Sequence, residues 1–226
     1  YVGQRVERKD STEKLTGDAQ YVSDMIVAGM LYGRVKQSPH ARAKIRDIDT
    51  SKARALPGVR AVVIGDDLDY RLGLYVVDKA ILAKGEVRHY GEAVAAVAAD
   101  SLEIAQAAVD LIDVDYEVLE PVLHPLDALE DNAPLVHPDL GNYDYMKAVF
   151  SPQPGTNVAN HTKIRKGDVD KGFEDSEWII EREYTNPSVQ HVPMETHVAI
   201  VEWKHGDKVN IWSSAQSPFT LRNLFA

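Results

Sequence analysis

The stretch SVQHVPMETHVAIVEW, residues 188–203, concentrates residue types that bind metals or move protons. In a β-strand, side chains alternate between two faces, so His191, Glu195 and His197 would all lie on one face. Two imidazoles and one carboxylate on one face form the ligand set of non-haem iron sites. Pro193 interrupts regular strand geometry between them, and we therefore predict no metal site. A stand-alone iron enzyme remains an alternative that requires metal retention by the purified chain.

Residues for nucleophilic or nucleotide chemistry are sparse. The chain contains no cysteine, so its own side chains form no disulfide, thiolate zinc site or iron–sulfur cluster. Ser213 and Ser214 lack the glycines of a nucleophile elbow, and residues 155–156 lack the lysine of a phosphate loop. His137 precedes a proline and is predicted to be a turn residue on a polar surface. Any redox centre must therefore come from a bound cofactor or a partner.

The formal net charge of −10 is spread over the 226 residues and is not gathered into blocks. An acidic chain is repelled by nucleic-acid phosphates and by anionic membranes, so we expect neither as its main partner. A run of about eighteen apolar residues and a basic leader with an apolar stretch are both missing, so we expect neither a membrane span nor a signal peptide. The hydrophobic content of 44% is ample for one or two cores.

Hydrophobic periodicity predicts strands and helices that surround one core in the first 120 residues. Residues 50–59 are predicted as a short helix, and residues 100–112 as a second helix in which Asp100 and Glu103 have the spacing of a capping box. The small apolar run at 93–99 is typical of a strand covered on both faces. The second helix has an apolar stripe of Ala105, Ala108, Val109 and Ile112. The predicted strands are 30–37, 45–48, 59–64, 93–99 and 113–121, the first two as a hairpin or meander.

Prolines, glycines and acids accumulate between residues 121 and 156, which is typical of a surface connector. We therefore predict a first domain at 1–120, a connector at 121–156 and an incomplete second domain at 157–226. The second domain is predicted to contain a short helix that Asp168 caps, with one strand on each side, followed by the 188–203 stretch and a strand within 208–216. Its three tryptophans, Trp178, Trp203 and Trp212, are predicted to lie in the core.

The last residues, SPFTLRNLFA, begin like a helix. Ser217 has the position of a cap and Pro218 that of the first helical residue. No glycine, basic turn or polar tail closes the pattern before Ala226, so we expect the chain to be cut inside an element.

Six stretches carry a resemblance to a known family. They are EKLTGDAQYVSDM at 13–25, LYGRVKQSPHARAKIRDIDTSKARALPGVRAVV at 31–63, HYGEAVAAVAADSLEIAQAAVDLIDVDYEVL at 89–119, KGDVDKGFEDSEWIIEREY at 166–184, QHVPMETHVAIVEW at 190–203 and WSSAQSP at 212–218. In this order and spacing they resemble the start of the large, molybdopterin-binding subunit of the xanthine dehydrogenase and aldehyde oxidase family. The resemblance implies an α+β fold class: an α/β-hammerhead domain followed by the first strands and helix of a molybdopterin-binding domain.

The resemblance also implies a function, cofactors and partners. The chain would be a fragment or split subunit of a cytoplasmic molybdenum hydroxylase or dehydrogenase, in which a pterin-held molybdenum transfers oxygen between water and a carbon centre with two-electron transfer. The implied partners are the remainder of the large subunit, iron–sulfur and FAD domains or subunits, and a small-molecule substrate. The alternative is a non-catalytic assembly or binding module that reuses the hammerhead fold.

The resemblance further implies which residues contact the cofactor. Gln216 matches the family's cofactor-contacting glutamine, whose amide donates a hydrogen bond without carrying charge. Glu195 and His191 are further candidates for shaping the cofactor or substrate pocket, although plain structural use of their strand is favoured. The family's glycine-rich pterin loop and its base-like glutamate would follow Ala226. We therefore expect no catalytic residue in this chain, no cofactor held by it alone, and no activity alone.

Overall fold

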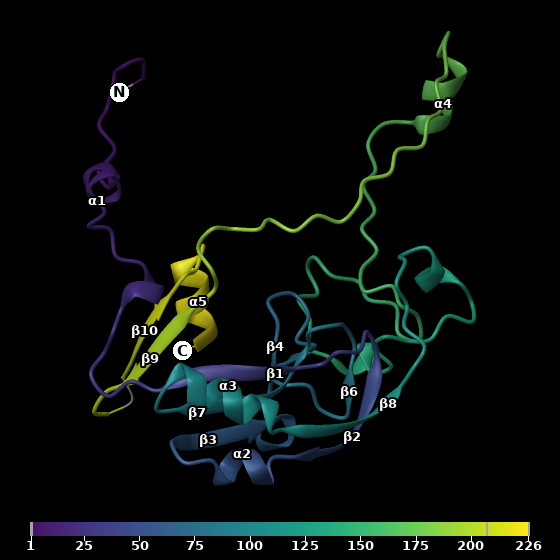
Figure 1. The fold of residues 1–226 in the computed structure, drawn as a ribbon. Coiled ribbons are helices and arrows are strands. Elements are labelled where there is room, and N and C mark those ends of the chain that lie inside the picture. Colours follow the sequence, from purple (N-terminus) through teal and green to yellow (C-terminus); the bar gives the residue numbers. More distant parts are fainter. Residues whose placement is uncertain (1, 207, 226) are drawn as a thin grey trace. The chain divides into compact units, whose positions relative to one another are not determined.

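The computed structural model describes residues 2–206 and 208–225, and it divides into two units. One unit is Met30–Glu177, and the other combines Tyr1–Gly29 with Trp178–Ala226. The strands are β1 (Tyr32–Gln37), β2 (Ala43–Asp49), β3 (Val59–Ile64), β4 (Arg71–Leu72), β5 (Lys79–Ala80), β6 (Glu86–Val87), β7 (Ala93–Ala99), β8 (Asp113–Val118), β9 (Ala199–Trp203) and β10 (Val209–Ser213). The α-helices are α1 (Ser11–Thr16), α2 (Ser51–Ala55), α3 (Leu102–Asp110), α4 (Val169–Glu174) and α5 (Pro218–Phe225) (Figure 1). This mixture confirms the predicted α+β class.

The centre of the Met30–Glu177 unit is a three-stranded sheet in the order β1-β7-β3, with β7 antiparallel to both neighbours. Helix α3 packs against β1 and β7, and α2 packs against β3. The predicted apolar stripe of α3 is confirmed, because all four of its residues are buried. The bounds of β3 and β7 also agree with the predicted strands at 59–64 and 93–99. A run of small apolar residues suits β7 because strands lie on both of its edges and all of its residues are buried or half-buried.

The predicted capping box of α3 is wrong, because the helix begins one residue later than expected. Ser101 is the cap, and its Oγ accepts a hydrogen bond from the Ile104 amide at 3.3 Å. The Asp100 carboxylate instead accepts two hydrogen bonds from the Arg60 guanidinium, at 2.7 and 2.8 Å. Nearby, Gly58 has a φ of +90°, and a Cβ there would lie 2.8 Å from Cδ1 of Ile104. A glycine is therefore required where the chain turns beneath α3.

The predicted β1–β2 hairpin is also wrong, because the two strands belong to different sheets. β2 pairs with β6 and β8 in a second three-stranded sheet. The turn after β1 is held by Ser38, which is 2% exposed and whose Oγ accepts from the His40 amide at 3.0 Å. The Ser38 amide donates to the Glu92 carbonyl, and the Gly91 amide donates to the Ser38 carbonyl, both at 2.9 Å. These bonds tie the turn to the segment before β7 and lead the chain away from β1.

The hydrophobic core of this unit contains two clusters, where the sequence predicted one core. The first lies under α2 and α3 and is formed by Ala53, Val62, Ala95, Val97, Ala108, Val109 and Ile112. The second is formed by Ala43, Ala83, Val87 and Val94. Val114 of β8 packs against both clusters. Through this side chain, β8 therefore contacts both clusters and links the two three-stranded sheets of the unit.

The segment that follows β8 is hydrogen-bonded to Arg42, which directly precedes β2. Arg42 donates to the Glu120 carbonyl at 3.2 Å and the Leu135 carbonyl at 3.1 Å, and it forms an ion pair with Glu86 at 2.8 Å. Both partners of this ion pair are largely buried, with exposed fractions of 13% and 16%. Leu140, at 4% exposed, belongs to the buried core although it lies in this proline-rich segment. Residues 121–156 thus form part of the packed Met30–Glu177 unit.

The predictions for residues 157–198 are partly confirmed. Asp168 caps α4 as predicted, because its Oδ1 accepts from the Lys171 amide at 3.0 Å. The strands predicted on each side of α4 are wrong, since no strand is found between 146 and 198. Extended residues form a strand only when a neighbour supplies the hydrogen-bonding ladder, and the described part of the chain offers none here. In addition, no helix within 2–206 and 208–225 is long and apolar enough to cross a membrane.

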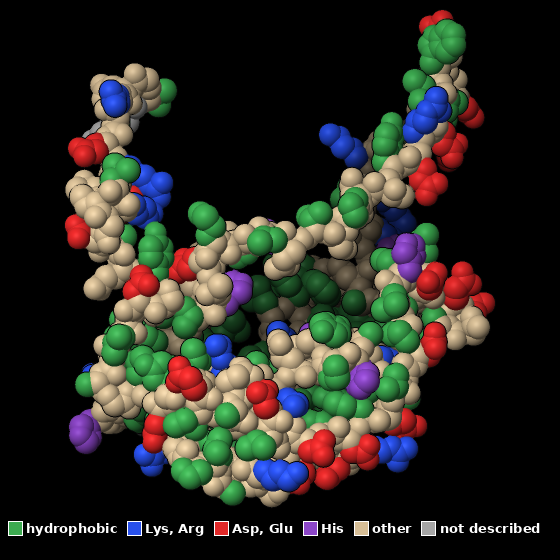
Figure 2. Space-filling model, viewed as in Figure 1, with side chains coloured by type: hydrophobic (Ala, Val, Ile, Leu, Met, Phe, Trp, Pro, Cys, Tyr) green, Lys and Arg blue, Asp and Glu red, His purple; other side chains and the backbone are tan. Residues whose placement is uncertain are grey.

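Two of the three tryptophans predicted to be core are at the surface. Trp178 is 81% exposed and Trp203 is 74% exposed, whereas Trp212 is half-buried. Figure 2 shows hydrophobic side chains at the surface of the extended stretches. The prediction that these tryptophans lie in the core is thus wrong for Trp178 and Trp203, because the described residues do not supply surfaces that bury them.

Candidate cofactor-binding site

The WSSAQSP motif lies at the end of an antiparallel hairpin formed by β9 and β10. Trp203 pairs with Val209, Val201 with Ile211, and Ala199 with Ser213. The pairing confirms the strand predicted within 208–216 and shows that the 188–203 stretch becomes a strand only at Ala199. In the same hairpin, an ammonium hydrogen bond from Lys204 lowers the pKa of the Glu202 carboxyl, which also accepts a bond from Asn210.

The remaining part of that stretch does not present one common face. His191, Glu195 and His197 are all exposed and lie outside any strand, with a bend at Met194 and Glu195. Val192 has a φ of 47°, a conformation that a β-branched residue rarely adopts and that breaks the alternation of side chains. Within residues 2–206 and 208–225, no group of three or more His, Cys, Asp or Glu side chains is placed to hold a metal ion.

Ser214 closes the base of the hairpin, a role that the sequence analysis did not identify. Its Oγ accepts from the Val198 amide at 3.0 Å and its amide donates to the Val198 carbonyl at 3.1 Å. The Ala215 amide donates to the Ser213 carbonyl at 2.9 Å and turns the chain out of the strand. Val198 lies 16 residues before Ser214. The residues next to Ser214 in the sequence therefore do not indicate that its hydroxyl bonds to Val198. Ser214 therefore serves to fix the turn that carries the next residues.

Gln216 lies in the bend between β10 and α5, and its side chain is exposed. Helix α5 begins at Pro218 as predicted, and the Leu221 amide donates to the Ser217 carbonyl at 3.1 Å. Gln216 thus lies two residues before the first residue of α5, near the end of a helix where backbone N–H groups and the helix dipole favour negative charge. This setting provides uncharged hydrogen-bond donors for an anionic or oxo-bearing group. The whole hairpin separates Gln216 from His191 and Glu195 along the chain, and the roles predicted for those two residues in a pocket remain predictions.

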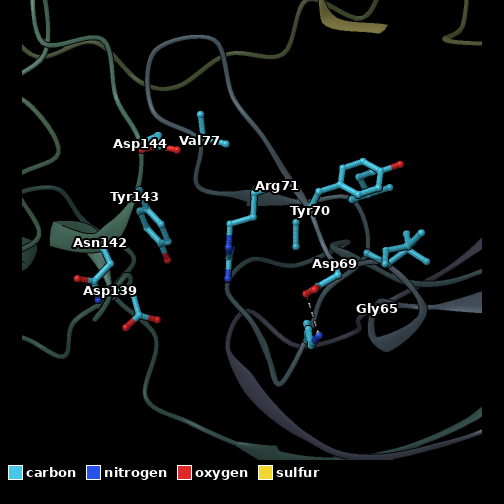
Figure 3. Close-up of a pocket in the computed structure, with 14 residues that line it drawn as sticks. Gly65, Asp69, Tyr70, Arg71, Val77, Asp139, Asn142, Tyr143 and Asp144 are labelled. Carbon is cyan, nitrogen blue, oxygen red and sulfur yellow. Dashed lines mark ion pairs between the residues drawn. The ribbon is translucent and has the colours of Figure 1, made fainter. Parts of the chain in front are cut away.

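A separate hollow of about 550 Å³ lies in the Met30–Glu177 unit (Figure 3). The Arg71 guanidinium lies over the ring of Tyr143, 5.2 Å from its centroid, and donates to the Asp78 carbonyl at 2.8 Å. Lys84 lies 3.9 Å from carboxylate oxygens of both Asp66 and Asp69. The lining thus mixes paired cations with carboxylates, so its charge favours neither an anionic nor a cationic ligand.

His137, predicted to be a surface turn residue, is partly buried beside this hollow. Its Nδ1 lies 3.2 Å from the Tyr143 hydroxyl, and its Nε2 lies 3.9 Å from the Asp78 carboxylate. Burial lowers the pKa of His137, and the nearby guanidinium of Arg88 lowers it further. The partners come from sequence positions up to 59 residues away, so the local His-Pro pattern could not reveal them.

Two domain-family models match the chain in succession. The model described as "Aldehyde oxidase and xanthine dehydrogenase, a/b hammerhead domain" matches residues 16–120. The model described as "Molybdopterin cofactor-binding domain" matches residues 150–226 and therefore includes β9, β10, Gln216 and α5.

Curated relatives match over most or all of the chain. A probable hypoxanthine oxidase, XdhD, of Escherichia coli K12 is 34% identical over the whole chain, which covers 26% of that protein. A probable xanthine dehydrogenase subunit of Bacillus subtilis is 37% identical over 86% of the chain and 25% of that protein. The nicotinate dehydrogenase large molybdopterin subunit of Eubacterium barkeri is 31% identical over 96% of the chain and 48% of that protein.

Solved structures agree with these matches. A reconstituted CO dehydrogenase from Oligotropha carboxidovorans has a TM-score of 0.85 and 31% identity over 98% of the chain and 28% of its own. A quinoline 2-oxidoreductase from Pseudomonas putida 86 has a TM-score of 0.80 and 30% identity over 98% of the chain and 28% of its own. The chain thus spans about a quarter of the length of the first relatives it matches.

Proposed function

Because the chain belongs to the xanthine dehydrogenase and aldehyde oxidase family, we propose that it is the amino-terminal part of the large subunit of a molybdenum hydroxylase or dehydrogenase. The observation that carries the proposal is the succession, on one chain, of a hammerhead domain and the beginning of a molybdopterin-binding region. Molybdopterin, when bound, supplies the two-electron chemistry by which oxygen passes between water and a carbon centre. The chain itself provides part of the protein scaffold around the cofactor and one hydrogen-bond donor, the side-chain amide of Gln216.

The residues around Gln216 fit such a group. The side-chain amide is exposed and uncharged, and Gln216 lies between a strand and a helix start, so the amide is available to donate to a ligand without adding charge. The bonds between Ser214 and Val198 fix the backbone two residues before Gln216. His191 and Glu195 belong to the same unit and are exposed, and we assign them the secondary role of shaping the pocket wall.

We assign no catalytic residue to this chain and expect it to be inactive alone. A chain that spans a quarter of its relatives supplies only some walls of an active site. The remaining walls would come from the rest of a large subunit, and electrons would pass to iron–sulfur and flavin domains or subunits. We place the complete enzyme in the cytoplasm.

The test is to isolate the native assembly that contains this chain from its source organism and to measure molybdenum and pterin content. We expect stoichiometric molybdenum and pterin together with a large-subunit polypeptide. An assembly that contains neither molybdenum nor pterin would favour a non-catalytic assembly module and overturn the proposal.

The same assembly tests the role of Gln216. Gln216→Ala should lower turnover with the enzyme's substrate by roughly 100-fold, the usual loss when one preorganised donor is removed. Gln20→Ala, which changes an equally exposed glutamine in a loop, is the control and should leave turnover unchanged. Equal turnover in the two variants would contradict the assignment of Gln216 but not the family-level proposal.

A further inference from the structure

The Met30–Glu177 unit contains a second hollow, about 340 Å³ in volume, which we call the histidine hollow. Its walls come from four segments, 76–78, 122–128, 136–140 and 156–159. Val77 lines the hollow of Figure 3, whereas its neighbours Val76 and Asp78 line the histidine hollow, so the segment 76–78 lies between the two. A volume of this size falls within the range of small-molecule sites.

Most of the lining is apolar and includes Val76, Val122, Pro125, Ala128, Val136 and Leu140. Such walls favour a ligand with an apolar body, because contact with them removes apolar surface from water. Two of the polar lining residues are already engaged in hydrogen bonds. The Thr156 hydroxyl donates to the Gln153 carbonyl at 2.8 Å, and the Asn157 side chain bonds to three backbone groups of the segment 128–136. The bonds of Asn157 join two walls, so the hollow is formed before any ligand binds.

Two polar groups on the lining lack a hydrogen bond to each other. The Asp78 carboxylate is 37% exposed and accepts no hydrogen bond from the described residues. Nε2 of His137 lies 3.9 Å from it, which is too long for a hydrogen bond. The nearby carboxylate favours the tautomer that carries the proton on Nε2, and we assign the Tyr143 hydroxyl, 3.2 Å from Nδ1, as the donor to that nitrogen. An acceptor and a donor therefore lie side by side on the lining.

A single hydroxyl group fits the gap between Asp78 and His137. An oxygen about 2.8 Å from both atoms would see them at an angle of about 90°, close to the angle between the donor and acceptor directions of a hydroxyl. Water carries the same group, but the apolar walls favour a hydroxyl that is attached to an apolar body.

We propose that the histidine hollow binds a small, uncharged and mainly apolar alcohol, whose hydroxyl donates to Asp78 and accepts from His137. The charges around His137 favour an uncharged ligand, because the guanidiniums of Arg71 and Arg88 are balanced by the carboxylates of Asp78 and Glu92. The inference does not depend on the proposed function, since Asp78 and His137 lie outside the residues 150–226 that match the molybdopterin-binding model.

Benzyl alcohol is a suitable probe, and its binding is measured by calorimetry with the full chain and with the native assembly that contains it. We expect a dissociation constant of roughly 1 mM in both, the range open to a ligand of about eight non-hydrogen atoms. Benzoate and benzylamine, which replace the hydroxyl by a charged group, and toluene, which lacks it, should each bind at least about tenfold more weakly. Toluene or a charged analogue that binds as tightly as benzyl alcohol would overturn the proposal.

Two variants test the location of the probe. Asp78→Ala removes the acceptor and should weaken binding of benzyl alcohol by about tenfold, whereas Asp131→Ala, a change of an exposed carboxylate outside the lining, should leave it unchanged. Ala159→Trp fills the hollow from an exposed position and should abolish binding without changing the urea midpoint. Undiminished binding in either Asp78→Ala or Ala159→Trp would overturn the proposal. Binding by the isolated chain but not by the native assembly would overturn it as well, because polypeptide would then cover the hollow.

Discussion

The Met30–Glu177 unit and the unit formed by Tyr1–Gly29 with Trp178–Ala226 differ in how they bury apolar side chains. Every buried hydrophobic residue in the described chain lies between Ala43 and Tyr143, inside the first unit. The second unit has two strands and two α-helices but no fully buried side chain within 2–29, 178–206 and 208–225. Regular secondary structure is therefore present in both, whereas a closed core is present in only one.

The difference shows what local patterning can achieve. β7 lies between two strands and under a helix, so its apolar residues are buried by neighbours from the same chain. β9 and β10 also carry large apolar residues, but they are paired only with each other. Hydrophobic burial is roughly proportional to the area removed from water, so identical residue types stabilise the first unit far more than the second.

Substituting one isoleucine in each unit provides the largest contrast. Ile112 is 2% exposed between α3 and β8, and Ile112→Ala should lower the free energy of unfolding by about 2–5 kcal/mol through lost burial and a residual cavity. Ile211 is 37% exposed in β10, and Ile211→Ala should cost less than about 1 kcal/mol in the isolated chain. Urea unfolding followed by circular dichroism, with hydrogen exchange at α3, measures both. Equal losses would contradict the contrast between the units.

The sequence was sufficient to predict elements whose signals are contiguous. The runs at 59–64 and 93–99 became β3 and β7, and the Ser-Pro pair at 217–218 correctly marked the start of α5. Periodicity does not specify which strand pairs with which, and so the β1–β2 hairpin was predicted wrongly. Within the 188–203 stretch, strand structure begins only at Ala199, because no neighbouring strand supplies hydrogen bonds to the residues before it.

In the candidate site, too, features with local sequence signals could be predicted, whereas contacts between distant residues could not. The position of Gln216 between a strand and a helix followed from local signals, namely an apolar strand pattern and a proline at the first helical position. The hydrogen bonds of Ser214 join it to Val198, and His137 lies beside Asp78; both partners are distant in the sequence. Residue types and spacing reveal a local setting, but a contact between distant residues requires the fold.

Removing the side chain of Asn157 should have an effect of intermediate size on the free energy of unfolding. Asn157 stabilises the segment after β8 by polar contacts. Its side-chain oxygen accepts from the Val136 amide at 2.8 Å, and its amide donates to the carbonyls of Ala128 and Pro134 at 3.2 and 3.1 Å. Asn157→Ala should cost about 1–3 kcal/mol, because partly buried backbone groups lose their partner. Limited proteolysis within 121–156 should accelerate accordingly.

The matched control is Asn132→Ala, which changes an exposed asparagine in the same segment. Its proteolysis rate should equal that of the unchanged chain. If Asn157→Ala behaves like this control, the segment after β8 is held by apolar contacts such as those of Leu140, and the hydrogen bonds of Asn157 contribute nothing measurable.

The smallest effect concerns pH and is confined to the Met30–Glu177 unit. The folded-state pKa of His137 lies below its ordinary value of 6.5, chiefly because of burial and then because of Arg88 and Arg71, while Asp78 and Glu92 oppose the shift. The unfolded chain therefore binds the proton first, so stability should fall as pH drops from above 6.5 through the lowered pKa. His137→Gln removes this titration, and its urea midpoint should decline less than that of the unchanged chain between neutral and mildly acidic pH. A steeper decline in the variant would mean that the Asp78 carboxylate, and not burial, determines the protonation of His137 in the fold.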